Sequence, residues 1–225
     1  MAGKGPLDLE GPEFPPAGGG KAGKLVLLLH GLGADGNDLI GLAPHLAPIV
    51  PAAHFLSPHA PFPCDMAPYG HQWFSLQDRS PAMILAGVQA ARTILDAFID
   101  QQLARFGLGE ADMALVGFSQ GTMVSLFTAP RRARAVAGIV GFSGALVGAE
   151  LLANETKARP PVLLVHGDAD PVVPVDASRA AKTALAAAGL PVELHIRPGL
   201  PHSIDQQGLI LGGRFLQKVL GARQG

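Results

Sequence analysis

The chain has 225 residues, of which 48 % are hydrophobic, and this is enough to bury the core of one α/β domain. Charged residues make up 16 % and the formal net charge is -1, which excludes a disordered polyelectrolyte and, with no basic stripe, disfavours a nucleic-acid partner. The single cysteine, Cys64, excludes an internal disulfide, so nothing in the composition requires an oxidising compartment.

The N-terminal region is rich in proline and glycine. Prolines at positions 6, 12, 15 and 16 disfavour a central strand, although a short edge strand fits. We therefore expect an N-terminal arm over residues 1–23, with room for an edge strand, and a single domain over residues 24–225. The arm contains no apolar signal-peptide core, and the longest weakly polar run, 135–147, is too short to span a bilayer. These features predict a cytoplasmic protein with no stable membrane insertion.

From residue 24 onward, strand patterns and helix patterns alternate. Continuous apolar runs predict strands at residues 24–29, 53–58, 112–118, 134–142, 161–167 and 191–198. Helical spacing predicts helices at residues 37–49, 81–106, 120–128, 177–188 and 204–220. Asn37 is the expected cap of the first helix, and Ser80 with Pro81 is the expected start of the second. This alternation is typical of a mostly parallel central sheet with helices on both faces, whose reactive groups collect at the carboxyl ends of the strands.

Two serines follow expected strands within the same local sequence, Val-Gly-Phe-Ser. Ser119 lies in a full Gly-x-Ser-x-Gly pattern, residues 117–121, between a strand and a helix. The two glycines let neighbouring backbone pass close to the serine, and the N–H groups at the start of the helix favour a developing negative charge. Ser143 has alanine at the fifth position of its pattern and no clear helix after it. The sequence therefore favours Ser119 as a nucleophile and Ser143 as a loop residue at the same sheet edge.

A serine nucleophile needs an imidazole to take its proton and a carboxylate to orient the imidazole. Asp168 and Asp170 follow the strand expected at 161–167, and His202 follows the last strand. The order Ser, Asp, His is the chain order of the α/β-hydrolase triad. These patterns leave Asp168 and Asp170 both open as the acid. No cluster shows metal-ligand spacing, so we expect neither a metal nor a cofactor.

Taken together, these segments resemble the phospholipase/carboxylesterase family of α/β-hydrolases, which also contains the acyl-protein thioesterases. The matching segments are "LLLHGLGADGNDL", "QWFSL", "GFSQG", "HGDADPVVP" and "HSI", and they fall within residues 27–204. The resemblance implies an α/β-hydrolase fold in which Ser119 is the nucleophile, Asp170 the orienting acid and His202 the base. It also implies that the backbone N–H groups of Leu32 and Gln120 form the oxyanion hole.

Five further residues are expected to bind the substrate. Trp73 and Phe74 fall in the family's Trp-Phe/Tyr segment beside the cleft. Ser143, Leu146 and Val172 lie in the segments that follow two expected strands. The segment between those strands, 143–160, is too short to hold the helical cap domain that lipases insert there. An open cleft suits short or medium acyl esters, or an acyl chain presented by a larger molecule.

The leading functional hypothesis is a carboxylesterase that hydrolyses short- to medium-chain, small-molecule esters through a Ser-His-Asp acyl-enzyme mechanism. An acyl-protein thioesterase or lysophospholipase-type activity is the alternative, because both leaving groups depart from the same tetrahedral intermediate. A dienelactone-type hydrolase is disfavoured, since its nucleophile is a cysteine. A non-catalytic binding module on this fold is the hypothesis from another class, and the intact Ser, Asp and His argue against it. The sequence leaves a homodimer open.

Overall fold

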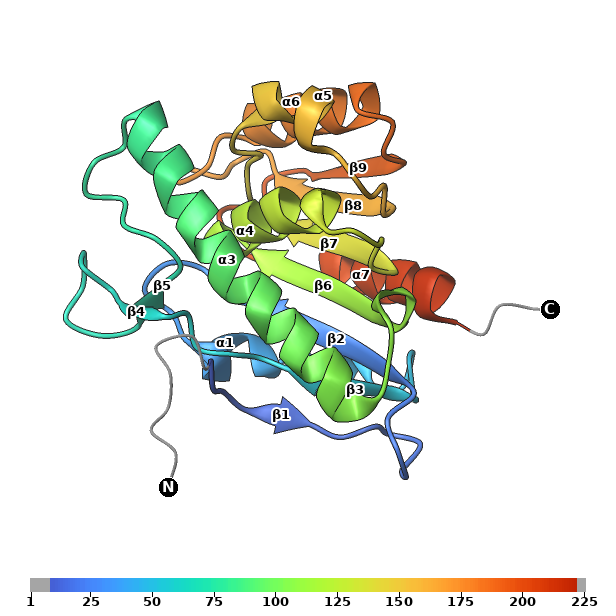
Figure 1. Cartoon of the computed structure of the whole chain (residues 1–225). Coiled ribbons are helices and arrows are strands. Elements are labelled where there is room, and N and C mark those ends of the chain that lie inside the picture. Colours follow the sequence, from blue (N-terminus) through green and yellow to red (C-terminus); the bar gives the residue numbers. More distant parts are fainter. Residues whose placement is uncertain (1–8, 222–225) are drawn as a thin grey trace.

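The central strand β2 (Lys24–Leu29) shows how the sequence builds the sheet. Its apolar run alternates between two cores, because Leu25 and Leu27 pack into one hydrophobic cluster while Val26 and Leu28 pack into the other. A strand buried on both faces belongs inside a parallel sheet that helices cover on both sides. The computed structural model describes residues 9–221 and has this architecture (Figure 1).

The sheet has seven strands in the order β1-β3-β2-β6-β7-β8-β9. The other strands are β1 (Glu13–Phe14), β3 (Ala53–Leu56), β6 (Met113–Phe118), β7 (Gly138–Phe142), β8 (Val162–Gly167) and β9 (Val192–Arg197). All neighbours are parallel except the short edge strand β1, which pairs antiparallel with β3. The predicted mostly parallel sheet is therefore confirmed, and β1 is the edge strand for which the N-terminal arm had room.

The helices divide between the two faces of the sheet (Figure 1). One face carries α3 (Pro81–Phe106), α4 (Gln120–Thr128), α5 (Leu152–Glu155) and α6 (Val175–Ala187). The other carries α1 (Gly36–Ile40), α2 (Ala43–Leu46) and α7 (Gln206–Leu220). Short 3-10 turns are η1 (Glu110–Asp112), η2 (Ala129–Arg131) and η3 (Ala149–Leu151). Between β7 and β8 the chain forms η3 and α5 and no larger insertion.

Three elements differ from the sequence prediction. The helix expected over 37–49 is two short helices, and its cap is Asp35, whose carboxylate accepts the N–H of Asn37 at 2.7 Å. Strand β7 begins at Gly138 instead of 134, and in the stretch before it Arg134 pairs with Glu110 at 3.3 Å. A two-stranded hairpin, β4 (Phe62–Pro63) with β5 (His71–Gln72), was not predicted, since pairs of two residues leave no apolar pattern.

Helix α3 is long and apolar enough to cross a membrane by length and composition. In the fold it contributes Val88, Leu95 and Ile99 to the core and packs against α4, so a core-facing stripe explains its apolar character. Ser80 holds the N-cap position before Pro81, as predicted, although its side chain makes no capping hydrogen bond. Gly107, with φ of 66°, ends the helix in the left-handed conformation that glycine adopts most easily.

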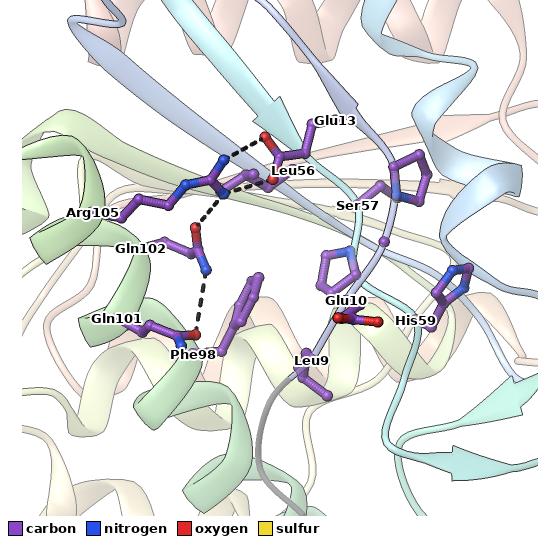
Figure 2. Close-up of a pocket in the computed structure, with 13 residues that line it drawn as sticks. Leu9, Glu10, Glu13, Leu56, Ser57, His59, Phe98, Gln101, Gln102 and Arg105 are labelled. Carbon is purple, nitrogen blue, oxygen red and sulfur yellow. Dashed lines mark hydrogen bonds and ion pairs between the residues drawn. The ribbon is translucent and has the colours of Figure 1, made fainter. Parts of the chain in front are cut away.

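The N-terminal segment lies against the C-terminal part of α3. Arg105 donates to both carboxylate oxygens of Glu13, at 2.6 Å and 3.0 Å, and this hydrogen bond holds the pKa of Glu13 below its usual range (Figure 2). A crevice of about 870 Å³ runs beside this ion pair, with the Phe98 side chain and the Leu9 side chain among its walls. The Glu13–Arg105 pair thus fastens the edge strand β1 to the domain.

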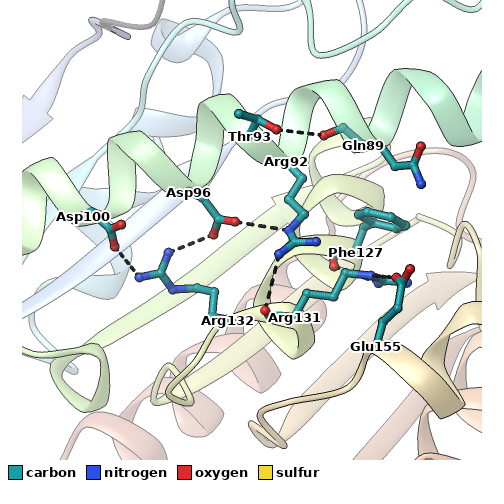
Figure 3. A network of polar contacts seen from close by, with 9 residues as sticks. All are labelled: Gln89, Arg92, Thr93, Asp96, Asp100, Phe127, Arg131, Arg132 and Glu155. Carbon is teal, nitrogen blue, oxygen red and sulfur yellow. Dashed lines mark hydrogen bonds and ion pairs between the residues drawn. The ribbon is translucent and has the colours of Figure 1, made fainter.

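A polar network joins α3 to the end of α4 and to α5 (Figure 3). Arg132 pairs with Asp96 at 2.8 Å, and Arg92 pairs with the other oxygen of Asp96 at 3.2 Å. Arg131 is 2 % exposed, lies over the Phe127 ring and pairs with a glutamate of α5. The buried arginines are therefore paired, as a low-dielectric interior requires.

At the far edge of the sheet, β9 pairs with β8 alone. Its Glu193 pairs with Lys218 of α7 at 3.2 Å, and its Arg197 pairs with Asp205 at 3.0 Å. Both ends of this edge strand therefore carry ion pairs.

Candidate active site

The carboxyl ends of β6, β8 and β9 place three candidate catalytic residues in loops at one edge of the sheet. Ser119 directly follows β6, Asp170 lies three residues after β8, and His202 lies five residues after β9. Because parallel strands end at the same edge, residues that are 83 positions apart in the sequence can meet there.

Ser119 occupies a strained strand-to-helix turn. Its φ of 52° and ψ of −114° lie in a region that L-residues rarely adopt. A Cβ at Gly117 would lie 2.5 Å from the backbone of Gly121, and a Cβ at Gly121 would lie 1.8 Å from the carbonyl oxygen of Leu29. Only glycine fits at either position, so the steric reason for the Gly-x-Ser-x-Gly pattern is present. Helix α4 starts at the next residue, Gln120.

Asp170 and His202 form a directed pair. The Nδ1 of His202 lies 2.6 Å from Asp170 Oδ2, while Asp170 Oδ1 accepts the N–H groups of Val172 and Val173 at 2.8 Å and 2.9 Å. Burial raises the pKa of Asp170, but the hydrogen bonds from His202 and from the two amides outweigh it and hold that pKa below its usual range. The carboxyl group is therefore an ionised acceptor, which fixes His202 with its proton on Nδ1.

Asp168, the other aspartate that the sequence left open, has a different partner. Its Oδ1 accepts the N–H of Gly199 at 2.6 Å, and the residue is exposed. Asp168 therefore joins the loop after β8 to the turn after β9, while Asp170 contacts the imidazole.

The expected oxyanion loop lies against the nucleophile turn. A Cβ at Gly31, next to Leu32, would lie 3.3 Å from Ser119 Cβ. Gly33 donates its N–H to the carbonyl oxygen of His71 at 2.9 Å, which ties the loop to β5. The second expected donor, the N–H of Gln120, is at the first position of α4, where helical amides have no partner inside the helix. The positions of both amides fit an oxyanion hole, which stays a prediction.

The five expected substrate-binding residues fall into two groups. Trp73 (0 % exposed), Phe74 (3 %) and Ser143 (1 %) are buried, and their role in substrate binding stays a prediction. Leu146 is half-buried against the α3 core, and Val172 is 64 % exposed beside Asp170.

No group of three or more His, Cys, Asp or Glu that could hold a metal occurs within residues 9–221.

Ser143 and Ser119 share a level in the sheet and a positive φ. Phe142 pairs with Phe118 across β7 and β6, so the two serines follow neighbouring strands at the same level. Ser143 also has a positive φ, 48°, yet no helix starts behind it, and its buried Oγ has no hydrogen-bond partner among the described residues.

Two side chains next to the pair were missed by the sequence analysis. The ring of Phe118 lies 4.8 Å from the ring of His202, and Phe118 also contacts Gly31. His166 lies 3.2 Å from Asp170, although a His-Gly at the end of a strand indicates no role in a site. The available signal for His166 was its place in the pattern His-Gly-Asp-Ala-Asp, residues 166–170.

The side chain of Gln120 fastens the Trp-Phe segment to the nucleophile turn. Its Oε1 accepts the N–H of Trp73 at 2.8 Å, and its Nε2 donates to the carbonyl oxygen of Phe74 at 2.8 Å. Gln120 is 1 % exposed, so both backbone groups lack access to water. The Gln120 side-chain amide therefore supplies the hydrogen bonds that a neighbouring strand would otherwise give to the backbone of residues 73–74.

We predict that Gln120→Leu lowers the free energy of unfolding by about 2–4 kcal/mol, because two buried backbone groups lose their partner. Urea titration followed by circular dichroism measures it. The matched control is Gln89→Leu on the exposed face of α3, which should stay within about 0.5 kcal/mol of the parent. Equal stability of the two variants would show that the Gln120 clamp contributes nothing.

Comparison with known proteins places this geometry in context. The model of the family described as Phospholipase/Carboxylesterase matches residues 16–220. The esterase YpfH of Escherichia coli (strain K12) is 29 % identical over 188 residues, which are 84 % of this chain and 79 % of that protein. The crystal structure of esterase PE8 is similar at a TM-score of 0.90 and 43 % identity, over 94 % of this chain and 99 % of that one. The structure of Zea mays acyl-protein thioesterase 2 has a TM-score of 0.74 at 25 % identity, over 94 % of this chain and all of that one (100 %).

The family match covers nearly the whole described fold, including β6, β8, β9 and the loops that follow them. The resemblance read from five short segments is thus confirmed, together with the α/β-hydrolase fold. The chain belongs to the phospholipase/carboxylesterase family of esterase-type hydrolases.

Proposed function

We propose that this chain is a carboxylesterase that hydrolyses short- to medium-chain carboxylic esters through an acyl-enzyme on Ser119. The observation that carries the proposal is the 2.6 Å contact between Asp170 and His202 at the sheet edge where Ser119 sits in a strained turn. A serine hydroxyl is a weak nucleophile at neutral pH and gains reactivity from an oriented imidazole. The largely buried turn at the start of α4 supplies the remaining requirement, a helix N-terminus for the developing charge.

The mechanism follows the positions of the protons. His202 carries a proton on Nδ1, so its Nε2 is free to take the proton of Ser119 Oγ as that oxygen bonds to the ester carbonyl carbon. The carbonyl oxygen becomes an oxyanion, which the N–H groups of Leu32 and Gln120 stabilise. His202 then gives the proton to the departing alkoxide, and the acyl group stays on Ser119. Water, deprotonated by His202, attacks the acyl-enzyme, and the proton returns to Ser119 as the carboxylic acid leaves.

The absence of a large insertion between β7 and β8 in the described chain limits the apolar surface for a long acyl chain. We predict that kcat/KM falls steeply from butyrate to palmitate in a series of p-nitrophenyl esters, with no increase in rate at an oil–water interface. Initial rates below and above the solubility limit of each ester measure both effects. Comparable kcat/KM for butyrate and palmitate, with activation at the interface, would contradict the short-chain assignment.

A thioesterase acting on acylated proteins is the second candidate, supported by the similarity to the maize structure named acyl-protein thioesterase 2. An acylated peptide and an acyl-CoA, assayed beside the p-nitrophenyl series, separate the two activities.

A binding module without catalysis is the candidate from another class. A fluorophosphonate probe distinguishes it, because an active serine hydrolase is labelled on Ser119 and a binding module is not.

We further propose a cytoplasmic location, a small-molecule ester as partner, and neither nucleic acid nor stable membrane insertion. These follow from the composition and from the core-facing role of α3. A homodimer is compatible with them.

A further inference from the structure

A second histidine contacts the carboxylate of Asp170. His166, in β8, is 0 % exposed, and its Nε2 lies 2.8 Å from the carbonyl oxygen of Val173 and 3.2 Å from Asp170 Oδ2. The carbonyl oxygen of Val173 only accepts, so Nε2 carries the hydrogen and donates it there, with Asp170 Oδ2 beside it at 3.2 Å. The other ring nitrogen, Nδ1, lies 2.7 Å from Ser178 Oγ and is then the acceptor of that hydroxyl.

Asp170 Oδ2 therefore lies between two imidazoles. His202 approaches at 2.6 Å and His166 at 3.2 Å, while Oδ1 is occupied by two backbone N–H groups. Three donors therefore hydrogen-bond the carboxylate, and the His166 N–H lies beside the oxygen that contacts His202. The carboxylate is fully buried, so it has no water with which to replace a lost donor.

We propose that His166 is a positioning residue for the acid, a role that rests on the proposed function of Asp170 within the triad. Its Nε2–H donates to Val173 O and so holds the loop whose Val172 and Val173 amides bind Asp170 Oδ1, which orients the carboxylate toward His202. The Nε2–H also lies 3.2 Å from the Oδ2 that contacts His202, so its positive end weakens the attraction of Asp170 for the His202 imidazolium.

The surroundings of His166 explain why it can hold this position. Ser178 anchors the ring from α6, and Ser178 Oγ also lies 3.3 Å from the carbonyl oxygen of Gly144, after β7. The charged groups on the neighbouring elements have partners elsewhere. They are Asp168 with the N–H of Gly199, Asp176 with Arg179, and Arg197 with Asp205. Asp170 is thus the titratable group that His166 contacts directly, and His202 contacts the same carboxylate oxygen.

Two amide substitutions separate the donor at Nε2 from the acceptor at Nδ1. The amide of asparagine reaches the place of Nδ1, so His166→Asn keeps a partner for Ser178 and removes the N–H that donates to Val173 O and lies beside Asp170 Oδ2. The amide of glutamine reaches the place of Nε2, so His166→Gln restores that donor. We expect the acidic limb of the kcat/KM profile to move up by about half to one pH unit in His166→Asn, the size of one hydrogen bond. We expect kcat to fall by up to about 100-fold with little change in KM, and both effects to be largely reversed in His166→Gln.

The titration of His202 by NMR tests the same proposal without any turnover. In the parent protein the ¹⁵N shifts of His166 should show a neutral ring protonated on Nε2, and in His166→Asn the pKa of His202 should rise. His195→Leu is the control, because His195 lies on the neighbouring strand β9, paired with Val165 on the other face of the sheet. If His166→Asn does not fold, Ser178→Ala removes the anchor and should shift His202 in the same direction by less.

An unchanged His202 titration in folded His166→Asn, or a parent ring protonated on Nδ1, overturns the proposal. A purely packing role would lower stability and leave both the titration and the acidic limb where they are in the parent. Failure of the proposed function looks different: no ester hydrolysis and no fluorophosphonate label on Ser119, with the His202 titration still responding to residue 166.

Discussion

Ser119→Ala is expected to lower kcat by about 10⁶-fold, which leaves only the rate that the oxyanion hole and substrate binding supply. The turn at Ser119 presents the hydroxyl beside Gly31 and at the start of α4, and no other side chain can replace it as the nucleophile. The measurement is the steady-state rate with p-nitrophenyl butyrate, combined with the intact mass after treatment with diisopropyl fluorophosphate. A diisopropylphosphoryl adduct on the Ser119→Ala protein would falsify the assignment.

Ser143→Ala is the matched control, because Ser143 also follows a strand and also has a positive φ. We expect kcat/KM to change by about tenfold at most, or ~1.4 kcal/mol, since its hydroxyl is buried and starts no helix. Peptide mapping of the labelled parent protein should find the adduct on the peptide that contains Ser119. An adduct on the Ser143 peptide would assign the nucleophile to the other strand.

Asp170→Asn is expected to lower kcat by about 10⁴-fold while the protein remains folded. An asparagine amide in place of the carboxylate can donate to Nδ1 of His202, which would move the ring proton to Nε2 and leave no base facing Ser119. Single-turnover rates with a p-nitrophenyl ester measure the loss. A shift of the His202 ¹⁵N resonances toward the other tautomer is the accompanying spectroscopic sign.

Asp168→Asn tests whether the two aspartates have been distinguished correctly. Asp168 accepts a hydrogen bond from Gly199 and does not share the contact to His202, so its kcat should stay within about tenfold of the parent. A small loss of stability is the expected effect, measured by urea titration. If Asp168→Asn loses activity and Asp170→Asn keeps it, both folded by circular dichroism, the acid has been assigned to the wrong residue.

The sequence predicted the fold well where the chemistry is local. Apolar runs located the strands, and glycines on both sides of Ser119 revealed a turn that only glycine can flank. The sheet edge at which Ser119, Asp170 and His202 lie followed from the parallel order of the strands. These inferences need only the period of a pattern and the rule that parallel strands end together.

Features that depend on distant partners could not be predicted. The choice between Asp168 and Asp170 depends on which one faces a loop 32 residues further along the chain. The contact of His166 with Asp170 depends on the way the loop after β8 folds back over its own strand. The burial of Trp73 similarly depends on the Gln120 amide, since nothing near Trp73 in the sequence offers its N–H a partner.

The edge strand β9 has a consequence for self-association. An unpaired edge offers a row of N–H and C=O groups on which another chain can add a strand, and proteins commonly discourage this with charged side chains. Here Glu193 and Arg197 are ion-paired at the two ends of β9, so a neighbouring strand would have to displace or bury those pairs. At the other edge, β1 offers only two residues, too few to template a strand. Any homodimer is therefore expected to form through helices or loops, and concentrated protein to resist assembly into extended sheets.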